Sequence, residues 1–201
     1  LLLHDVGKGL PEVRKLNKEG QPSDHGHEAK SAELTVQIMK RLRYPEKFSK
    51  LVTWLVAEHM RFAPMLISGE KTLLRWVRSE ATSGTFRNQT ELTYAYKQLV
   101  EVFLADMEAT HARKNPTLME NGRALGEQVI ELAREKMPVA NSDLAISGKD
   151  LLEIIPKEQI KNALSYLLER VQSGNLPNEK EALLTAMQKH LQKTLKGNDD
   201  E

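Results

Sequence analysis

Apolar residues recur every three or four positions along most of the chain, which is the spacing of helices that bury one face. No stretch alternates apolar and polar residues for long enough to predict a half-buried strand. The spacing predicts helices over residues 27–43, 46–60, 71–80, 89–112 and 118–136, with further helices near the C-terminus. The sequence therefore predicts an all-α protein, a helical bundle followed by a helical extension.

Two of these helices have clear inward faces. The stripe of the helix over residues 27–43 contains the residues Ser31, Leu34, Ile38 and Leu42. The stripe of the helix over residues 46–60 contains the residues Phe48, Leu51, Val52, Leu55 and Val56. We expect both stripes to be buried against the rest of the bundle.

Residues with strong turn or capping preferences indicate where the remaining elements begin and end. We expect a first short helix to end near Gly7 and Gly9, because glycine suits the residue that follows a helix C-terminus. Ser147 is followed three residues later by Asp150, and Asn178 is followed three residues later by Glu181. Both pairs have the spacing of a capping box at a helix N-terminus.

A break at Asn115 and Pro116 divides the predicted helices into two groups. We expect one domain over residues 1–115 and a helical C-terminal region over residues 116–196. Residues 197–201 are short of apolar positions and are expected to form a disordered tail.

Composition narrows the function classes. The 201 residues include 29 basic and 28 acidic residues, so the net charge of +1 provides no global attraction for nucleic acid. The absence of cysteine excludes disulfides, zinc fingers and thiol nucleophiles, and it favours a cytoplasmic protein. The longest apolar runs are far shorter than the roughly 20 residues of a membrane span, so no membrane partner is expected.

Three ionisable residues, His27, His59 and Asp106, continue apolar stripes of the predicted helices. Each is expected to face inward, where an isolated carboxylate costs several kcal/mol unless it has a partner. His4 and Asp5 stand side by side at the predicted end of the first helix. We expect these five side chains to meet in one interior site.

Imidazole and carboxylate donors without sulfur suit a divalent metal such as Mg, Mn, Ni, Co, Fe or Zn, and the residue types do not choose among these ions. Such an ion supports phosphoester hydrolysis by activating water and neutralising phosphate oxygens. In the alternative interpretation, the histidines are hydrogen-bonded core residues and the aspartates are capping acceptors. Lys8 is expected either to hold a phosphate or to be a solvated lysine.

A local excess of positive charge lies on the predicted helices over residues 27–43 and 46–60. Between Lys30 and Arg61, seven basic residues face three acidic ones. The candidates for RNA contact are Lys40, Arg41, Arg43, Lys47 and Lys50. They are expected to bind phosphates without reading sequence, or to be the solvated sides of two helices, and no aromatic stacking platform is expected beside them.

Residues 2–8, LLHDVGK, resemble the LLHDxGK signature of the HD superfamily, metal-dependent phosphohydrolases with an all-α fold. The segments HGHE at residues 25–28, AEHM at residues 57–60 and FLADMEA at residues 103–109 follow in the order expected of that family. The resemblance implies metal ligation by His4, Asp5 and Asp106, with His27 and His59 as further ligands or phosphate contacts.

The same resemblance makes His4, Asp5 and Lys8 the expected catalytic residues. The first histidine of the HD pattern lies upstream of the His-Asp pair and has no room here, because the sequence starts at Leu1 without a methionine. We therefore expect this chain to be a piece of a longer protein. It should bind a divalent metal poorly, whereas a chain extended upstream should bind one tightly.

The second half is similar to the C-terminal region of bacterial CCA-adding tRNA nucleotidyltransferases. The segments that carry this similarity are SGKDLLEI from Ser147, the helix over residues 160–171 and SGNLPNEKEALL from Ser173. The resemblance implies tRNA as partner, and transfer of CMP and AMP to the tRNA 3′ end in the parent enzyme. The Gly-Ser and Asp-x-Asp head that binds nucleotides in those enzymes is not found in this sequence.

The hypothesis that combines these observations is the HD and tRNA-binding portion of a CCA-adding enzyme. Its own chemistry would be metal-dependent phosphohydrolysis, such as opening 2′,3′-cyclic phosphates or removing terminal phosphates. Two alternatives stay open, a stand-alone HD nucleotide phosphohydrolase and an RNA-binding scaffold whose HD site has become structural. The oligomeric state is not predicted.

Overall fold

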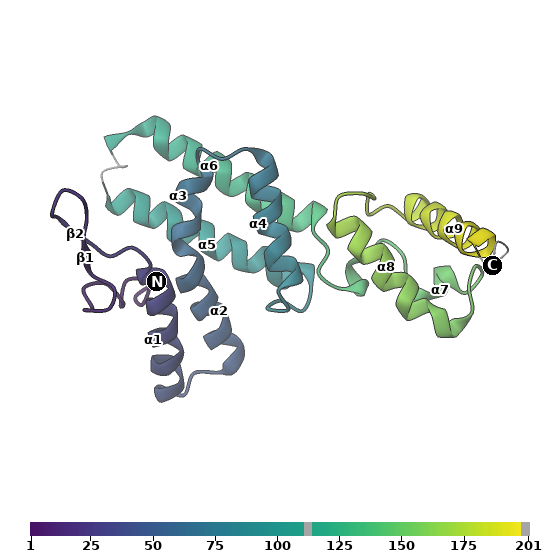
Figure 1. The fold of residues 1–201 in the computed structure, drawn as a ribbon, viewed down its shortest axis with the longest axis horizontal. Helices are drawn as coiled ribbons and strands as arrows, with labels where there is room; N and C mark the ends of the chain where they lie inside the picture. The colour runs from purple at the N-terminus through teal and green to yellow at the C-terminus, as the bar shows by residue number, and fades with distance from the viewer. Residues whose placement is uncertain (111–113, 198–201) are drawn as a thin grey trace. The chain divides into compact units, whose positions relative to one another are not determined.

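The computed structural model describes residues 1–110 and 114–197, with side chains described to residue 192, and it confirms the all-α prediction (Figure 1). The α-helices are α1 (His27–Arg41), α2 (Glu46–Glu58), α3 (Phe62–Met65), α4 (Glu70–Thr82), α5 (Gln89–Ala109), α6 (Pro116–Glu131), α7 (Gly148–Leu151), α8 (Ile160–Gln172) and α9 (Lys180–Gly197). Gly197 of the predicted tail belongs to α9, and residues 198–201 lie outside the described residues.

Short elements complete the description. The 3₁₀ helices are η1 (His59–Arg61), η4 (Asn141–Asp143) and η5 (Lys157–Gln159), and α6 continues into a π-helical turn, η3 (Leu132–Lys136). Strands β1 (Lys15–Leu16) and β2 (Pro22–Ser23) pair antiparallel, with Lys15 opposite Ser23. Among the described residues, no helix combines the length and the apolar character needed to cross a membrane.

Contacts between residues divide the chain into two compact units, which are described separately. The first unit contains Leu1–Thr72 and Ala95–Gln128, and the second contains Leu73–Tyr94 and the chain from Val129 onward. Each unit draws on two separate stretches of sequence, because three long helices cross from one unit to the other. The domain boundary expected after residue 115 stays a prediction.

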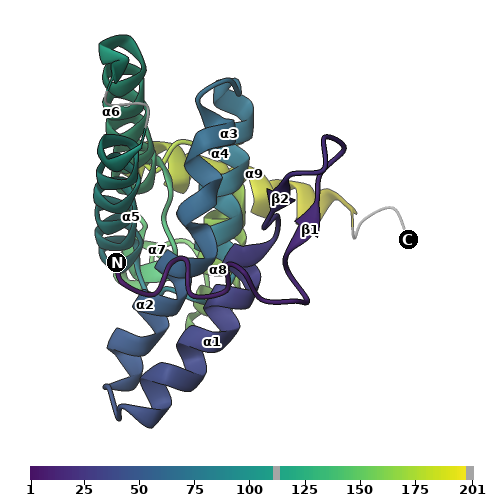
Figure 2. The same cartoon turned by 90° about the vertical axis from the view of Figure 1, so that its left-hand side faces the viewer.

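In the first unit, α1 and α2 lie side by side and run in opposite directions (Figures 1 and 2). Met39 of α1 packs with Val52 and Val56 of α2, and the partly buried Leu3 covers this cluster from the N-terminal segment. The ring of Phe62 in α3 stacks on that of Phe103 in α5, with centroids 4.8 Å apart. These contacts place the ends of α1 and α2 next to the N-terminal segment.

Helices α5 and α6 approach each other closely where α6 carries glycine. A Cβ atom added at Gly126 would meet Val100 Cγ1 at 2.6 Å, and one added at Gly122 would meet Met107 Sδ at 2.9 Å. Glycine in a helix interior normally destabilises by roughly 0.5–1 kcal/mol relative to alanine. A side chain at either position would press on Val100 or Met107, so glycine suits this close approach of the two helices.

The expected first helix is wrong, because residues 2–9 form successive turns instead. The backbone N–H of Gly7 donates to Ser31 Oγ in α1 at 2.9 Å, rather than to a carbonyl of its own segment. Gly9 has φ 79°, a left-handed conformation that favours glycine and directs the chain away from a helix. The turns leave the side chain of Asp5 facing His27 at the start of α1.

Helix α1 ends in a Schellman motif, whose left-handed position is occupied by Arg43 with φ 57°. The N–H of Tyr44 donates to the Met39 carbonyl at 3.1 Å, and the N–H of Arg43 donates to the Lys40 carbonyl at 3.1 Å. Glycine usually occupies this position, because a side chain there costs roughly 1–2 kcal/mol. The arginine is thus held in a backbone conformation that it does not favour.

Two residues expected to be buried lie exposed near this turn. Leu42 is 57% exposed and Phe48 is 48% exposed, although both continue inward stripes in the sequence. Leu42 is the C-cap of α1, and Phe48 lies in the first turn of α2. Helical periodicity indicates which side of a helix a residue faces, but not how far the element packed against that side extends. Both residues are exposed because they lie at the tip of the hairpin.

The second unit has its own apolar core, to which Leu151, Leu167 and Leu183 contribute fully buried side chains. The capping box predicted at α7 is confirmed, since Asp150 accepts hydrogen bonds from the N–H and the Oγ–H of Ser147, both at 2.8 Å. This core brings α7, α8 and α9 together.

The capping box predicted at Asn178 is wrong. Its side chain accepts a hydrogen bond from the N–H of Ala145 at 2.8 Å and donates one to the carbonyl of Asp143 at 2.9 Å. Helix α9 begins two residues later, at Lys180. Asn178 therefore ties the start of α9 to the loop before α7, an interaction with a distant segment that short-range spacing does not reveal.

Candidate metal centre

Three imidazole rings in the first unit are oriented by the same local interaction. The Nδ1 atoms of His4, His27 and His59 lie 2.7, 2.9 and 2.7 Å from the carbonyl oxygens of the residues three positions earlier in the chain. A carbonyl oxygen only accepts, so each Nδ1 carries the proton and donates. In the neutral imidazole, each Nε2 then presents a free lone pair.

The Nε2 atoms converge on the carboxylate of Asp5. His27 Nε2 lies 3.0 Å from Asp5 Oδ1, His59 Nε2 lies 3.7 Å from the same oxygen, and His4 Nε2 lies 3.3 Å from Oδ2. The two Nε2 atoms of His27 and His59 are 3.3 Å apart. The sequence prediction that His27 and His59 face inward is confirmed, since both are buried.

One oxygen of this group lacks a hydrogen bond. Asp5 Oδ1 is buried and accepts none within the described residues, although His27 Nε2 is within ion-pair distance. The Nδ1 tautomer explains this, because an unprotonated Nε2 has no hydrogen to donate. A buried carboxylate oxygen without a donor is unfavourable unless a cation completes its surroundings.

The donor atoms of Asp5, His27 and His59 all lie within 4.8 Å of one another. Two ligands bound to one ion at about 2.0–2.2 Å are separated by about 2.8–3.6 Å, depending on the coordination geometry. The observed separations of 3.0 and 3.3 Å fall in this range, and 3.7 Å lies just above it. The set also has the backbone carbonyl partners that commonly orient metal-bound histidines, so these residues fit a divalent metal.

The electrostatics around Asp5 and His59 favour the forms that bind metal. Burial raises the pKa of the Asp5 carboxyl, but the hydrogen bond from Lys8, the charge of Lys8 and the adjacent imidazoles outweigh burial, and the pKa lies below its ordinary value. Burial lowers the pKa of His59, and the neighbouring histidines lower it further. An ionised carboxylate and a neutral imidazole are the forms that bind metal.

Lys8, an expected catalytic residue, donates from Nζ to Asp5 Oδ2 at 2.7 Å. It therefore occupies the oxygen opposite the one that faces His27 and His59. Its side chain is 44% exposed, so the pair is a partly solvated one and contributes little to stability. Lys8 thus contacts Asp5 and stays accessible to solvent, and its catalytic role stays a prediction.

Asp106 was expected to face inward, and this is wrong, because its side chain is exposed. It is not part of the group formed by Asp5, His27 and His59 among the described residues. Asp106 lies one turn after Phe103, whose ring stacks on Phe62. The role of Asp106 as a ligand stays a prediction.

Ser31 and Asp24 also build this centre, although neither was expected from the sequence to belong to a site. Ser31 binds the N–H of Gly7, and Asp24 Oδ1 accepts from the N–H of Gly9 at 3.1 Å. Asp24 also pairs with Arg14, whose Nη2 atom lies 2.8 Å from Asp24 Oδ2. The one signal in the sequence was the small polar Ser31 on an otherwise apolar stripe.

The basic residues expected to bind RNA are exposed at the far end of the hairpin formed by α1 and α2. They are Lys40, Arg41, Arg43, Lys47 and Lys50. No aromatic stacking platform was expected beside them, and this stays untested, although the ring centroids of Tyr44 and Phe48 lie 5.4 Å apart among these residues. A contribution of these residues to RNA binding stays a prediction.

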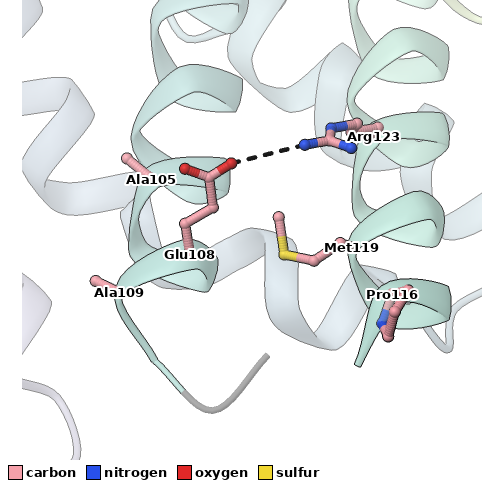
Figure 3. A pocket seen from close by; sticks show the side chains of 6 residues that line it. All are labelled: Ala105, Glu108, Ala109, Pro116, Met119 and Arg123. Carbon is pink, nitrogen blue, oxygen red and sulfur yellow. Dashed lines mark ion pairs between the residues drawn. The ribbon is translucent and has the colours of Figure 1, made fainter. Parts of the chain in front are cut away.

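A cavity of about 660 Å³ lies between the end of α5 and the start of α6 (Figure 3). Arg123 faces Glu108 across it, and Nη2 of Arg123 lies 3.6 Å from Oε1 of Glu108. Met119 also lines this cavity. None of the predicted metal, catalytic or RNA-binding residues lines this cavity.

Comparison with known proteins identifies the family. The model of tRNA nucleotidyltransferase domain 2 matches residues 30–187. The chain belongs to this family. Over 184 residues, which make up 90% of this chain, it is 31% identical to the A-adding tRNA nucleotidyltransferase of Deinococcus radiodurans. It is 34% identical over 74 residues, 37% of its length, to the multifunctional CCA protein of an Azoarcus species.

The matched regions are parts of longer proteins. They cover 38% of the Deinococcus protein and 17% of the Azoarcus protein. No solved structure matches this tRNA nucleotidyltransferase domain 2 chain significantly.

Proposed function

We propose that this chain is the HD and tRNA-binding portion of a tRNA nucleotidyltransferase that adds A or CCA, and that it holds a divalent ion for phosphoester hydrolysis. Transfer of CMP or AMP would be carried out by a catalytic head whose motifs this sequence does not contain. The family match and the names of the two relatives support the tRNA-processing role. The observation that supports the hydrolytic role is the buried oxygen of Asp5 between two Nε2 atoms.

Asp5, His27 and His59 would hold the ion, with His4 and Asp106 as further ligands. When bound, a divalent ion lowers the pKa of a bound water and polarises a phosphoester. The carbonyl bonds at the three Nδ1 atoms fix the imidazoles before substrate binds, so little reorganisation is needed. Lys8 would hold a phosphate oxygen from the solvent side.

The expected reaction is the opening of a 2′,3′-cyclic phosphate or the removal of a terminal phosphate. Water adds to phosphorus, one ester P–O bond breaks, and the released hydroxyl oxygen takes the proton that water loses. A 2′,3′-cyclic end thereby becomes a phosphomonoester. Cyclic and terminal phosphates both occur at RNA ends, so either substrate is compatible with tRNA as the partner.

Removal and return of metal tests this role. After chelation, the chain should hydrolyse bis-para-nitrophenyl phosphate no faster than buffer. One or more of Mn, Co, Ni, Fe, Zn or Mg, supplied in large excess because weak binding is expected, should restore turnover. Metal content measured by mass spectrometry should rise in parallel with activity. A chain that takes up no ion and shows no metal-dependent turnover would have a structural site, and the scaffold alternative would replace the hydrolase.

The basic residues at the hairpin tip support the tRNA-binding part of the proposal. Replacing Arg41 and Arg43 with glutamate should weaken binding of a tRNA transcript and flatten its salt dependence, by about one unit of slope for each lost phosphate contact. Fluorescence anisotropy at several salt concentrations measures both effects. Unchanged affinity and slope would make these residues a solvated helix surface.

A further inference from the structure

The tip of the hairpin formed by α1 and α2 exposes an apolar surface that the core does not use. Leu42, Tyr44 and Phe48 are 57%, 49% and 48% exposed. The rings of Tyr44 and Phe48 are one helical turn apart in sequence, with centroids 5.4 Å apart and planes inclined by 45°. About half of the surface of each of these residues is therefore exposed to solvent.

The same turn concentrates positive charge. Residues 40–50 include five basic side chains and one acidic one, whereas the whole chain has a net charge of +1. The acidic residue, Glu46, is paired with Lys50 at 2.8 Å. Within the part of the chain that the structure describes, Lys40, Arg41 and Arg43 form no ion pair. Their charges are free to bind an anion.

The backbone of the turn is well defined. Pro45 is the N-cap of α2, and the hydroxyl of Ser49 donates to its carbonyl at 3.1 Å. The Schellman motif of α1 fixes the preceding residues, and it holds Arg43 at φ 57°, where glycine would be less strained. An arginine in the left-handed conformation at an exposed turn is consistent with a use for its guanidinium group.

We propose that this tip, Leu42–Phe48 with the flanking basic residues, binds an unpaired nucleotide of RNA by stacking its base on Tyr44 and Phe48. The arginine and lysine side chains around the rings would hold the adjoining phosphates. Base stacking on aromatic rings combined with basic side chains is the usual chemistry of single-stranded RNA binding. The inference rests on the proposed function, since tRNA is the RNA expected to supply that nucleotide.

The tip is remote from the metal centre. His27 is the first residue of α1 and Arg41 is the last, so the 15 residues of the helix separate the two ends by about 21 Å. Substitutions at the tip therefore leave the donors of the metal centre unchanged. Binding at the tip can be measured separately from hydrolysis.

The test uses an oligoribonucleotide that contains 2-aminopurine, whose fluorescence changes on stacking, and a blunt RNA duplex of equal length. Tyr44→Ala with Phe48→Ala should lower affinity for the single strand about fivefold to 150-fold and abolish the fluorescence change. Duplex affinity should change less than twofold. Tyr44→Phe should retain stacking, and Tyr94→Ala, which removes another exposed tyrosine, should bind as the unchanged chain does.

A second variant separates binding from folding. Arg43→Gly relieves the left-handed strain, so it should keep or raise the melting temperature while it weakens binding of both RNAs. Equal losses on single strand and duplex in the aromatic variant, or no loss on either, overturn the stacking proposal. Binding to vesicles of phosphatidylcholine and phosphatidylserine is measured in parallel. If the aromatic variant loses binding to the vesicles but not to RNA, the tip is a membrane contact and the stacking proposal is overturned.

The result also distinguishes this inference from the function on which it rests. If Arg41→Glu with Arg43→Glu weakens RNA binding while the aromatic variant does not, stacking is excluded and the tRNA-binding role is retained. If the unchanged chain binds neither RNA nor tRNA, the stacking proposal and the tRNA-binding part of the proposed function both fail.

Discussion

Asp5→Asn is expected to lower the affinity of the chain for a divalent ion by at least about tenfold to a hundredfold, with a matching loss of phosphoester hydrolysis. Asp5 is the single anion among the three grouped donors, and its Oδ1 lies closest to His27 Nε2, at 3.0 Å. The amide keeps the size of the side chain and removes its charge. The range quoted is what the loss of a residue that only supports a ligand costs, so the loss of a ligand should reach or exceed it.

Titration with Co²⁺, followed by its visible absorption, measures the affinity, and bis-para-nitrophenyl phosphate measures turnover. His59→Ala should lower the affinity for Co²⁺ by a comparable factor, because it removes an imidazole donor. Glu12→Gln is the matched control, because Glu12 is an exposed acid of the same unit whose nearest partner is Lys30 at 3.5 Å. If Asp5→Asn binds Co²⁺ as tightly as the control, the group is a hydrogen-bonded core cluster.

Gly7→Ala is expected to destabilise the first unit by about 1–3 kcal/mol or more and to weaken metal binding, although Gly7 is not itself a donor. A Cβ atom there would lie 2.8 Å from the backbone nitrogen of Ser31 and 2.9 Å from the carbonyl oxygen of His27. Both are backbone atoms of the first turn of α1, which cannot move without shifting the helix. The N-terminal turns would separate from α1 and take Asp5 with them.

Urea unfolding followed by circular dichroism measures the stability change, and the Co²⁺ titration measures the loss of the site. Gly69→Ala is the control, since nothing lies within 4 Å of the added Cβ atom and the backbone there is not left-handed. It should be neutral or slightly stabilising. Wild-type stability in Gly7→Ala would show that the approach of the two segments adjusts easily.

Periodicity predicted the parts of the site that depend on helix faces. His27 and His59 follow apolar stripes and are buried, because each position is fixed by its own helix. Asp106 follows a stripe equally well and is exposed. The difference arises because burial requires a partner element opposite the residue, and the spacing within one helix contains no information about that partner.

Features that depend on contacts between distant segments were missed. The turns around Asp5 exist because Gly7 binds Ser31, 24 residues away, in place of a helical carbonyl. Asn178 likewise binds Ala145, 33 residues away, rather than capping its own helix. In both cases the local pattern permitted a helical role, and a long-range hydrogen bond decided against it.

The positions of the three donors in the chain have a consequence for proteolysis. Asp5 lies in the N-terminal turns, and His27 and His59, which are 32 residues apart, lie at the start of α1 and the end of α2. An ion held by all three would cross-link these segments reversibly in a chain without cysteine. Chelation would remove the cross-link and leave the exposed loop around β1 and β2 easier to cleave. Metal supply would then determine how long the N-terminal segment survives in the presence of proteases.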